Sequence, residues 1–267
     1  MQAVQRFKGG YPLLLQVGLR TLAGMSATQF HELPDGRKIA YRHTAGTGPA
    51  LVFLPGYMSD MSGSKAAAVF DHAEAAGREC LLLDYSGCGQ SDGQFADGSL
   101  SRWRDEVLAL ISAQVSGPVV LVGSSMGGWL MLLVGLALGE RLAGLVGIAA
   151  APDFSEWGYD EAQQTRLAAG ETVLEDNPYG PEPTPTHARF WQDAQANRLL
   201  SQEIPLNCPV RLLHGQEDHD VPPEISLRLA AALASTDVQV TLVKGGDHRL
   251  SRDGDIALLL RTIESLT

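Results

Sequence analysis

The sequence predicts an α/β fold with a mostly parallel central sheet flanked by helices. Short apolar segments alternate along the chain with longer helical patterns, which is the arrangement of βαβ units. The expected strands are almost free of polar residues, as is typical of strands covered on both faces. The length of 267 residues and the 45% of hydrophobic residues suit one large domain with a buried core.

The expected strands and helices follow one another from residue 30 to the end of the chain. Residues 30–33 and 39–43 flank the turn signal Pro34-Asp35-Gly36 and predict a first hairpin. Further strands are expected at residues 49–54, 79–84, 118–122, 142–150, 209–213 and 238–243. Helices are expected at residues 64–76, 101–115, 126–138 and 255–265.

The segment from Asp153 to Asn207 breaks this alternation. It is polar, contains the stretch NPYGPEPTPT at 177–186, and shows helical patterns but no clear strand. We therefore expect a small helical cap at about 153–207, packed over one edge of the sheet. The cap would be an insertion within a single domain of residues 29–267.

Residues 1–28 differ from the rest of the chain and are expected to form an N-terminal extension, either disordered or a leader. They hold Arg6, Lys8 and Arg20 and no acidic residue, although the whole chain has a net charge of −11. Basic, acid-poor leaders have this composition, but Met25 offers an equally reasonable start. We expect a cytoplasmic protein, with an organelle or export as the alternative.

Composition and charge exclude several classes of partner. A net charge of −11 without a Lys/Arg cluster is not typical of a nucleic-acid-binding protein. The apolar stretch at 11–19 is too short to span a bilayer, so we expect no stable membrane insertion. Cys80, Cys88 and Cys208 show neither a disulfide framework nor zinc-ligand spacing. We therefore expect a reduced compartment and no metal.

The stretch VGSSMGGW at 122–129 contains the candidate nucleophile. Gly123, Ser125 and Gly127 match the pattern G-x-S-x-G, with an apolar strand expected before it and a helix after it. The tight turn strains the residue at its apex, and glycine two positions before and after removes collisions with it. The pattern predicts Ser125 as the nucleophile, with a helix N-cap as the alternative role. The glycine spacing leaves Ser124 a capping or packing role.

A nucleophilic serine needs a base, and the base needs an orienting acid. In this architecture the chain order is serine, acid, histidine. Asp218 follows the strand expected at 209–213 and is the predicted acid, with Asp220 as runner-up and Glu217 less well placed. His248 lies between the last expected strand and the last helix and is the predicted base. Order or location disfavours the other histidines, which are His31, His43, His72, His187, His214 and His219, although His214 is placed to bond the acid loop.

Two backbone N–H groups are expected to form an oxyanion hole. Met126 begins the helix after the nucleophile, and Tyr57 follows the strand expected at 49–54 in the tight turn Pro55-Gly56-Tyr57. A plain β-turn is the alternative for this second segment. The glycine-rich turn at 84–91 lacks G-x-G-x-x-G spacing, so it predicts a loop beside the site and no dinucleotide. Cys88 within it lacks a base at the expected place.

These motifs together resemble the α/β-hydrolase superfamily. PGY, DYSGCGQSDG, GSSMGGW, HGQEDHDVP and GDHR occur in that order at the spacing of that superfamily. More narrowly, LPGYMSDMSGSKA, WRDEV and NCPVRLLHG resemble the mitochondrial abhydrolase-domain acyl-protein thioesterases of animals and their bacterial relatives, which are also described as acyl-glucuronide esterases. The resemblance implies an α/β-hydrolase fold, hydrolysis of S-palmitoyl thioesters or related acyl esters, and a triad of Ser125, Asp218 and His248.

The predicted function is therefore that of a serine hydrolase, either palmitoyl-protein thioesterase-like or a carboxylesterase, which works through an acyl-enzyme. We expect a small-molecule or acylated-protein substrate and no cofactor. The alternatives are the same triad acting on another bond, as in a carbon–carbon hydrolase or perhydrolase, and a non-catalytic ligand-binding relative. Trp129, Trp157 and Trp191 are candidates to line an acyl pocket, with core packing favoured for Trp129. The sequence leaves the acyl length, the leaving group and the oligomeric state open.

Overall fold

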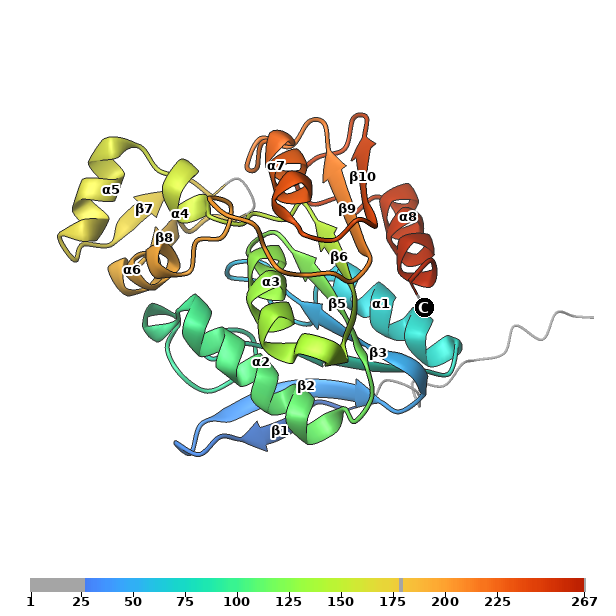
Figure 1. Cartoon of the computed structure of the whole chain (residues 1–267). Helices are drawn as coiled ribbons and strands as arrows, with labels where there is room; N and C mark the ends of the chain where they lie inside the picture. The colour runs from blue at the N-terminus through green and yellow to red at the C-terminus, as the bar shows by residue number, and fades with distance from the viewer. Residues whose placement is uncertain (1–26, 178–179, 267) are drawn as a thin grey trace, which may run out of the picture.

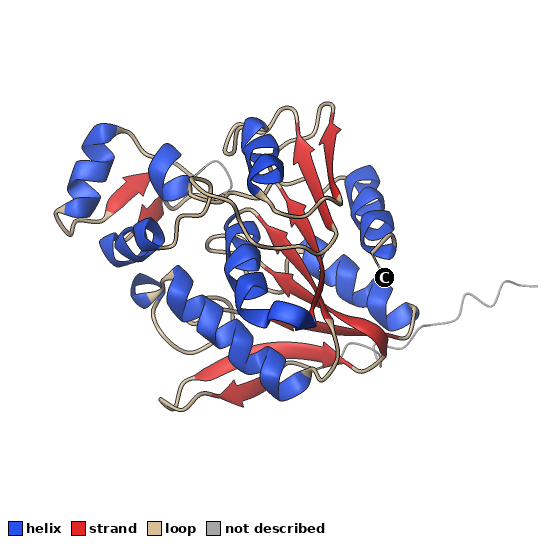
Figure 2. Cartoon of the chain, viewed as in Figure 1, coloured by secondary structure: helices blue, strands red, loops and turns tan. Residues whose placement is uncertain are grey.

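The computed structural model describes residues 27–177 and 180–266, so the expected N-terminal extension lies almost entirely outside the described residues. Its centre is an eight-stranded sheet with the strand order β1-β2-β4-β3-β5-β6-β9-β10 (Figure 1). Helices cover both faces of this sheet (Figure 2). The α/β fold that the sequence predicts is confirmed.

The sheet is parallel from β4 to β10 and antiparallel at its first edge. β1 pairs with β2 and β2 with β4 in antiparallel register, and the remaining neighbours are parallel. Parallel strands bring their carboxyl ends to the same edge, where α/β proteins place their binding sites. The strands are β1 (Gln29–Glu32), β2 (Lys38–Thr44), β3 (Thr47–Leu54), β4 (Arg78–Leu83), β5 (Val119–Ser124), β6 (Leu142–Ile148), β9 (Val210–Gly215) and β10 (Val238–Val243).

Two groups of helices bury the two faces of the sheet. One face is covered by α1 (Ser64–Ala75) and α8 (Asp253–Glu264). The other is covered by α2 (Leu100–Gln114), α3 (Met126–Leu138) and α7 (Glu224–Ala232), with the short 3₁₀ turns η1 (Phe95–Asp97) and η2 (Gly139–Arg141) nearby. The sequence did not predict α7, because two prolines precede it and it has only nine residues.

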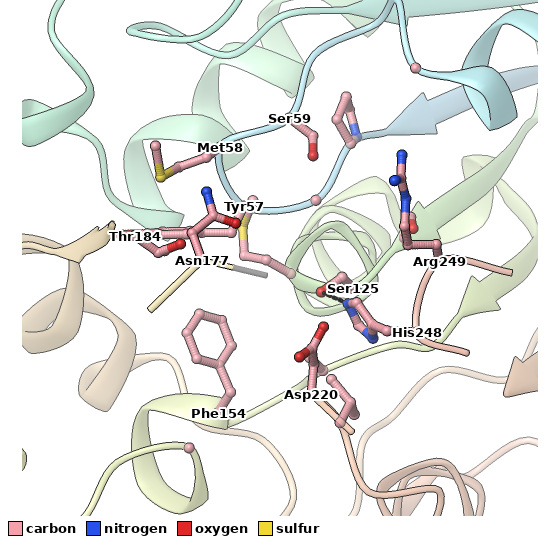
Figure 3. Close-up of a pocket in the computed structure, with 18 of the residues that line it drawn as sticks. Tyr57, Met58, Ser59, Ser125, Phe154, Asn177, Thr184, Asp220, His248 and Arg249 are labelled. Carbon is pink, nitrogen blue, oxygen red and sulfur yellow. Dashed lines mark hydrogen bonds between the residues drawn. The ribbon is translucent and has the colours of Figure 1, made fainter. Parts of the chain in front are cut away.

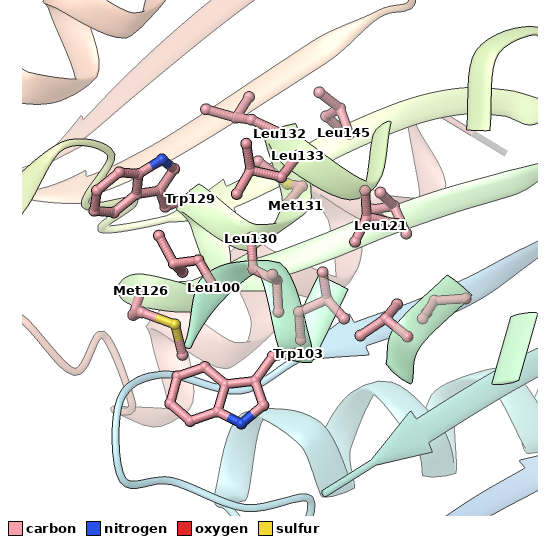
Figure 4. Packing of buried hydrophobic residues seen from close by; sticks show 14 of the residues in the cluster. Leu100, Trp103, Leu121, Met126, Trp129, Leu130, Met131, Leu132, Leu133 and Leu145 are labelled. Carbon is pink, nitrogen blue, oxygen red and sulfur yellow. The ribbon is translucent and has the colours of Figure 1, made fainter. Parts of the chain in front are cut away.

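The helix α3 is apolar on every side and belongs to the larger hydrophobic cluster. Figure 4 shows Leu130 of this helix between Trp103 of α2 and the strand side chain Leu121, with Trp129 in the same cluster. A helix without a polar face must be buried on all sides. Trp129 is fully buried, as expected, and its indole N–H donates to the carbonyl of Asn197 at 3.0 Å. Among the described residues, no helix is long and apolar enough to cross a membrane.

The segment between β6 and β9, which we call the cap (residues 153–207), contains a small sheet as well as helices. Its helices are α4 (Phe154–Trp157), α5 (Glu161–Ala168) and α6 (Ala188–Ala196). β7 (Val173–Glu175) and β8 (Thr184–Thr186) pair in antiparallel register. The expectation of a cap without strands is therefore wrong. Three-residue strands show no alternating pattern, and a proline in the middle of β8 argues against a strand.

Candidate active site

The three predicted site residues come together at the carboxyl edge of the sheet, although 123 positions separate the first from the last. Ser125 follows β5, Asp218 follows β9 and His248 follows β10. The Ser125 Oγ lies 3.0 Å from Nε2 of His248 (Figure 3). Nδ1 of His248 lies 2.8 Å from Oδ2 of Asp218. The arrangement is an unbroken hydrogen-bonded chain from a hydroxyl through an imidazole to a carboxylate.

Ser125 has the strained backbone that its motif predicts. Its φ of 54° and ψ of −121° lie in a region that side-chain-bearing residues rarely adopt. A Cβ on Gly123 would lie 2.4 Å from the carbonyl oxygen of Gly127, and one on Gly127 would lie 2.1 Å from that of Leu54. Ser125 occupies the N-cap position of α3, but its side chain caps nothing there. The hydroxyl is left to bond His248.

The carboxylate of Asp218 fixes which ring nitrogen of His248 carries the proton. Burial alone would raise the pKa of this carboxyl. Hydrogen bonds from His214 and His248, the charge of His248 and the N–H of Val221 instead hold its pKa well below the usual value. An ionised carboxylate only accepts hydrogen bonds, so the Nδ1–H of His248 donates to it. Nε2 is then free to accept the proton of the Ser125 hydroxyl.

His214 is hydrogen-bonded to the loop after β9 that carries Asp218, as the sequence predicts. It is fully buried, and its Nε2–H donates to the carbonyl of Val221 at 2.9 Å and approaches Oδ2 of Asp218 at 3.2 Å. Its Nδ1 accepts from the hydroxyl of Ser226 at 2.7 Å. The other oxygen of Asp218 accepts from the N–H groups of Asp220 and Val221, each at 2.9 Å. This network orients the carboxylate toward His248.

The predicted oxyanion donors belong to segments next to Ser125: Met126 is the following residue, and a Cβ on Gly56, which precedes Tyr57, would lie 3.4 Å from the Cβ of Ser125. In the described part of the chain, the N–H groups of Tyr57 and Met126 donate no hydrogen bond to another group. The segment that carries Tyr57 turns sharply, because the N–H of Ser59 donates to the carbonyl of Gly56 at 3.1 Å. Unpaired N–H groups at a helix start and a turn are suited to hold a developing negative charge.

The glycine-rich turn at 84–91 supports this segment, as expected. The hydroxyl of Tyr85 donates to the carbonyl of Pro55 at 3.0 Å, and Oδ1 of Asp84 accepts from the N–H of Met61 at 2.8 Å. Both bonds fix the chain that runs from β3 to α1. Sequence reasoning placed this turn beside the site but named neither side chain, since no motif spacing marks them.

A cavity of about 760 Å³ opens above Ser125, between the sheet edge and the cap. Its walls include Met126 and Tyr57 from the sheet side and Phe154 and Trp157 from the cap. Of the three tryptophans proposed from sequence, only Trp157 lines it. Trp129 lies in the core, and the indole N–H of Trp191 donates to the carbonyl of Ser155 inside the cap: both belong to the packing that surrounds the cavity.

The alternative site residues have different surroundings. Asp220 lines the cavity with an exposed side chain, and Figure 3 shows its carboxylate facing Ser125 and His248. Glu217 is exposed. Burial raises the pKa of the Cys88 thiol to about 12, so it stays protonated and is a poor nucleophile.

One group of side chains in the described residues has a spacing that suits a metal ion. Asp218, Asp220 and His248 each offer a ligand atom within 4.8 Å of the others. Two of these three side chains are already hydrogen-bonded to each other at 2.8 Å. A metal would have to break that bond, so the donor set fits proton transfer better than metal binding.

Comparison with known proteins gives the same family along most of the chain. Residues 51–257 match the family described as the alpha/beta hydrolase family. Over 253 residues the chain is 40% identical to the mitochondrial palmitoyl-protein thioesterase ABHD10 of Mus musculus, covering 92% of this chain and 84% of that protein.

Two solved structures agree with this result. The mouse alpha/beta hydrolase domain-containing protein 10 is 37% identical with a TM-score of 0.84, covering 90% of this chain and 98% of that one. A putative hydrolase from Agrobacterium vitis S4 has the same identity and TM-score, covering 90% of this chain and 99% of that one. The resemblance that the motifs indicate is thus confirmed, and the chain belongs to the alpha/beta hydrolase family.

Proposed function

We propose that this protein is a serine hydrolase that cleaves acyl thioesters or esters through an acyl-enzyme, with Ser125, His248 and Asp218 as its triad. The observation that carries the proposal is the hydrogen-bonded chain from Ser125 Oγ to Asp218, which opens into a cavity beside two unpaired N–H groups. Relatives named palmitoyl-protein thioesterase support the thioester as the bond that is cleaved.

The geometry supports a two-step reaction. Ser125 Oγ attacks the acyl carbonyl carbon while Nε2 of His248 takes its proton, and Asp218 stabilises the imidazolium that forms. The carbonyl oxygen becomes an oxyanion held by the N–H groups of Tyr57 and Met126; loss of one such donor costs about 3–4 kcal/mol in other enzymes with an oxyanion hole. The imidazolium of His248 then gives its proton to the departing sulfur or oxygen, which leaves as a thiol or alcohol. Water repeats these steps on the acyl-enzyme, releasing a carboxylic acid and free Ser125.

The cap supplies the side of the cavity that an acyl chain would contact. The cavity volume of about 760 Å³ lies within the ~300–1,000 Å³ that is usual for small-molecule sites. Phe154 and Trp157 offer apolar surface on the cap side of the cavity. We propose that residues 153–207 act as a cap over an acyl-binding site within a domain of residues 29–267.

The partner and the compartment follow from the same proposal. The substrate is an acylated protein or a small acyl ester, and both present the same carbonyl group to Ser125. The animal relatives have the word mitochondrial in their names, which supports an organelle as the alternative to the cytoplasmic location that the sequence predicts. Subcellular fractionation of the source cells separates the two locations.

Hydrolysis of a graded series of acyl thioesters and oxygen esters, from acetyl to palmitoyl, tests the proposal. We expect turnover by the native protein and a loss of about 10⁴-fold or more in kcat for Ser125→Ala, because the nucleophile is gone. Ser124→Ala is the matched control, since Ser124 neighbours Ser125 and ends β5 with a buried side chain. It should keep most of the activity.

Three results would contradict the proposal. Full activity in Ser125→Ala would remove Ser125 from the reaction. Failure of the native protein to hydrolyse any member of the series, despite binding them, would favour a ligand-binding relative. Cleavage of carbon–carbon bonds, or formation of peracids from hydrogen peroxide, in place of ester hydrolysis would favour the same triad in another reaction.

A further inference from the structure

Tyr57 belongs to both halves of the site at once. Its backbone N–H lies in the turn after β3, whereas its side chain reaches the cap. The phenolic O–H donates to the carbonyl of Pro185 in β8 at 3.0 Å. Its ring centre lies 4.9 Å from that of Phe190 and 6.2 Å from that of Phe154, both of the cap. One residue therefore joins the candidate oxyanion hole to the cap.

The other end of the same turn is fixed to the sheet side. Tyr85 donates to the carbonyl of Pro55, which is two residues before Tyr57. The ring of Tyr57 also meets Phe95 at 5.0 Å and Trp103 at 6.4 Å. The turn is thus held at Pro55 by the domain core and at Tyr57 by a ring cluster to which the cap contributes. Figure 3 shows Tyr57 on the side of the cavity where the cap residue Thr184 lies.

Other hydrogen bonds hold the cap through residues outside this turn. The carboxylate of Asp153 accepts from the N–H groups of Leu199 and Leu200, which closes the two ends of the cap on each other. The N–H of Ser101 in α2 donates to the carboxylate of Asp193 in α6. These contacts join the two ends of the cap to each other and join α6 to α2. The Tyr57–Pro185 bond instead joins the cap to the turn that carries the candidate oxyanion donor.

We propose that Tyr57 is a positioning residue that couples the cap to the oxyanion hole. The position of the cap relative to the sheet edge then determines the position of the Tyr57 N–H. The inference rests on the proposed hydrolase function. Transition-state donors lose most of their effect when displaced by about 1 Å. An acyl chain that binds against the cap and fixes its position would therefore bring the Tyr57 N–H into place. The preference for one chain length would then appear in kcat as well as in KM.

The side chain of Tyr57 is suited to this role at all ordinary pH values. Burial raises the pKa of its hydroxyl well above the usual value, so the O–H remains a donor to the Pro185 carbonyl. Substitution by phenylalanine removes the interactions of this hydroxyl with Pro185 and Thr186, both in β8, and keeps both the ring cluster and the backbone N–H. Tyr57→Phe is therefore the variant that isolates the coupling.

The test compares Tyr57→Phe with Gln195→Met on acetyl and palmitoyl thioesters. Gln195 also donates to a cap carbonyl, that of Ser155 at 2.7 Å, but touches neither the turn nor the cavity lining. We expect Tyr57→Phe to lower kcat about tenfold on both substrates, with KM for the acetyl thioester nearly unchanged. Complete loss of one oxyanion donor costs ~10²–10³-fold. Gln195→Met should leave kcat near the native value.

A second variant approaches the coupling from the cap side. Phe190→Leu removes the closest ring contact of Tyr57 and keeps the Tyr57 side chain; Phe190 does not line the cavity itself, although its ring also stacks on Phe154 at 5.7 Å. It should lower kcat for the acetyl thioester in the same way, and the double variant should lose less than the product of the two single losses. This variant keeps the inference testable if Tyr57→Phe does not fold.

Three outcomes would overturn the inference. The first is an unchanged kcat for the acetyl thioester in Tyr57→Phe, with only a higher KM for the palmitoyl thioester. In that case Tyr57 would serve only as a wall of the cavity and would not position the oxyanion hole. The second is an equal loss of kcat in Gln195→Met, which would indicate general loosening of the cap. The third is a loss of kcat in the double variant equal to the product of the losses in Tyr57→Phe and Phe190→Leu, which would mean that the two residues act independently. Failure of the hydrolase proposal would look different, since Ser125→Ala would then keep its activity.

Discussion

The sheet edge and the cap form the two walls of one cavity, but different forces hold them. Ser125 follows β5, whose residues are all buried and paired with β3 and β6 on either side. The cap has shorter elements and combines a ring cluster around Phe190 with single polar contacts, such as the buried carboxylate of Asp153. Strand pairing and apolar packing fix the residues that would carry out the chemistry. Ring contacts and individual hydrogen bonds fix the wall that would choose the acyl chain.

This difference predicts that damage to the sheet edge abolishes turnover, whereas damage to the cap changes stability and selectivity. After loss of the nucleophile itself, the largest effect is expected for Asp218→Asn. An amide cannot accept from Nδ1–H and keep the present network, so His248 takes the wrong tautomer and kcat falls about 10³–10⁴-fold. Steady-state kinetics on a short thioester measures this loss.

The control for that variant is Asp220→Asn, which changes the other carboxylate that faces the site. We expect it to keep kcat within about tenfold of the native value, because it leaves the 2.8 Å bond between Asp218 and His248 intact. A greater loss in Asp220→Asn than in Asp218→Asn would reverse the assignment of the acid.

The next effect in size is expected at the serine turn. Gly127→Ala would place a Cβ 2.1 Å from the carbonyl oxygen of Leu54 and 2.4 Å from that of Pro55. Both atoms belong to the backbone, which cannot move aside as the end of a flexible side chain can. The turn must shift, and a displacement near 1 Å costs about 10²-fold in kcat. Gly117→Ala, where no atom lies within 4 Å, is the matched control and should be neutral. Equal activity in both variants would contradict the packing account.

On the cap side, Asp153→Ala should act on stability more than on chemistry. It leaves the N–H groups of Leu199 and Leu200 without their acceptor, at roughly 1–3 kcal/mol for each buried group. Urea unfolding measures the loss, and limited proteolysis should cut first within residues 153–207. Native-like resistance of the cap to proteolysis would show that this carboxylate does not hold it.

The smallest effect is a dependence of stability on acid. The folded pKa of Asp218 is lowered, so its ionisation stabilises the fold above the unfolded value of about 3.9 and this contribution is lost as pH falls through the folded value. The gap in unfolding free energy between the native protein and Asp218→Asn should therefore narrow below pH ~4. A gap that widens on acidification would contradict the lowered pKa.

The two regions also differ in how far the sequence predicted them. Strand and helix bounds on the sheet side agree closely with the structure, because apolar runs and the glycines around Ser125 leave few alternatives. The same reasoning located Asp218 and His248, since each lies in the loop that follows an apolar strand. It missed β7 and β8, and it named neither Phe190 nor the Tyr57–Pro185 bond. Those features depend on contacts between segments that no local pattern records.

Locating a covalent adduct tests the central claim most directly. The native protein would be treated with a fluorophosphonate, digested, and mapped by fragment-ion mass spectrometry that separates Ser124 from Ser125. We expect a single adduct on Ser125 that disappears in Ser125→Ala and persists in Ser124→Ala. The reason is that the Ser125 hydroxyl lies 3.0 Å from Nε2 of His248, the base that would activate it. An adduct on another residue, or hydrolysis that continues with Ser125 unlabelled, would contradict the assignment of the nucleophile.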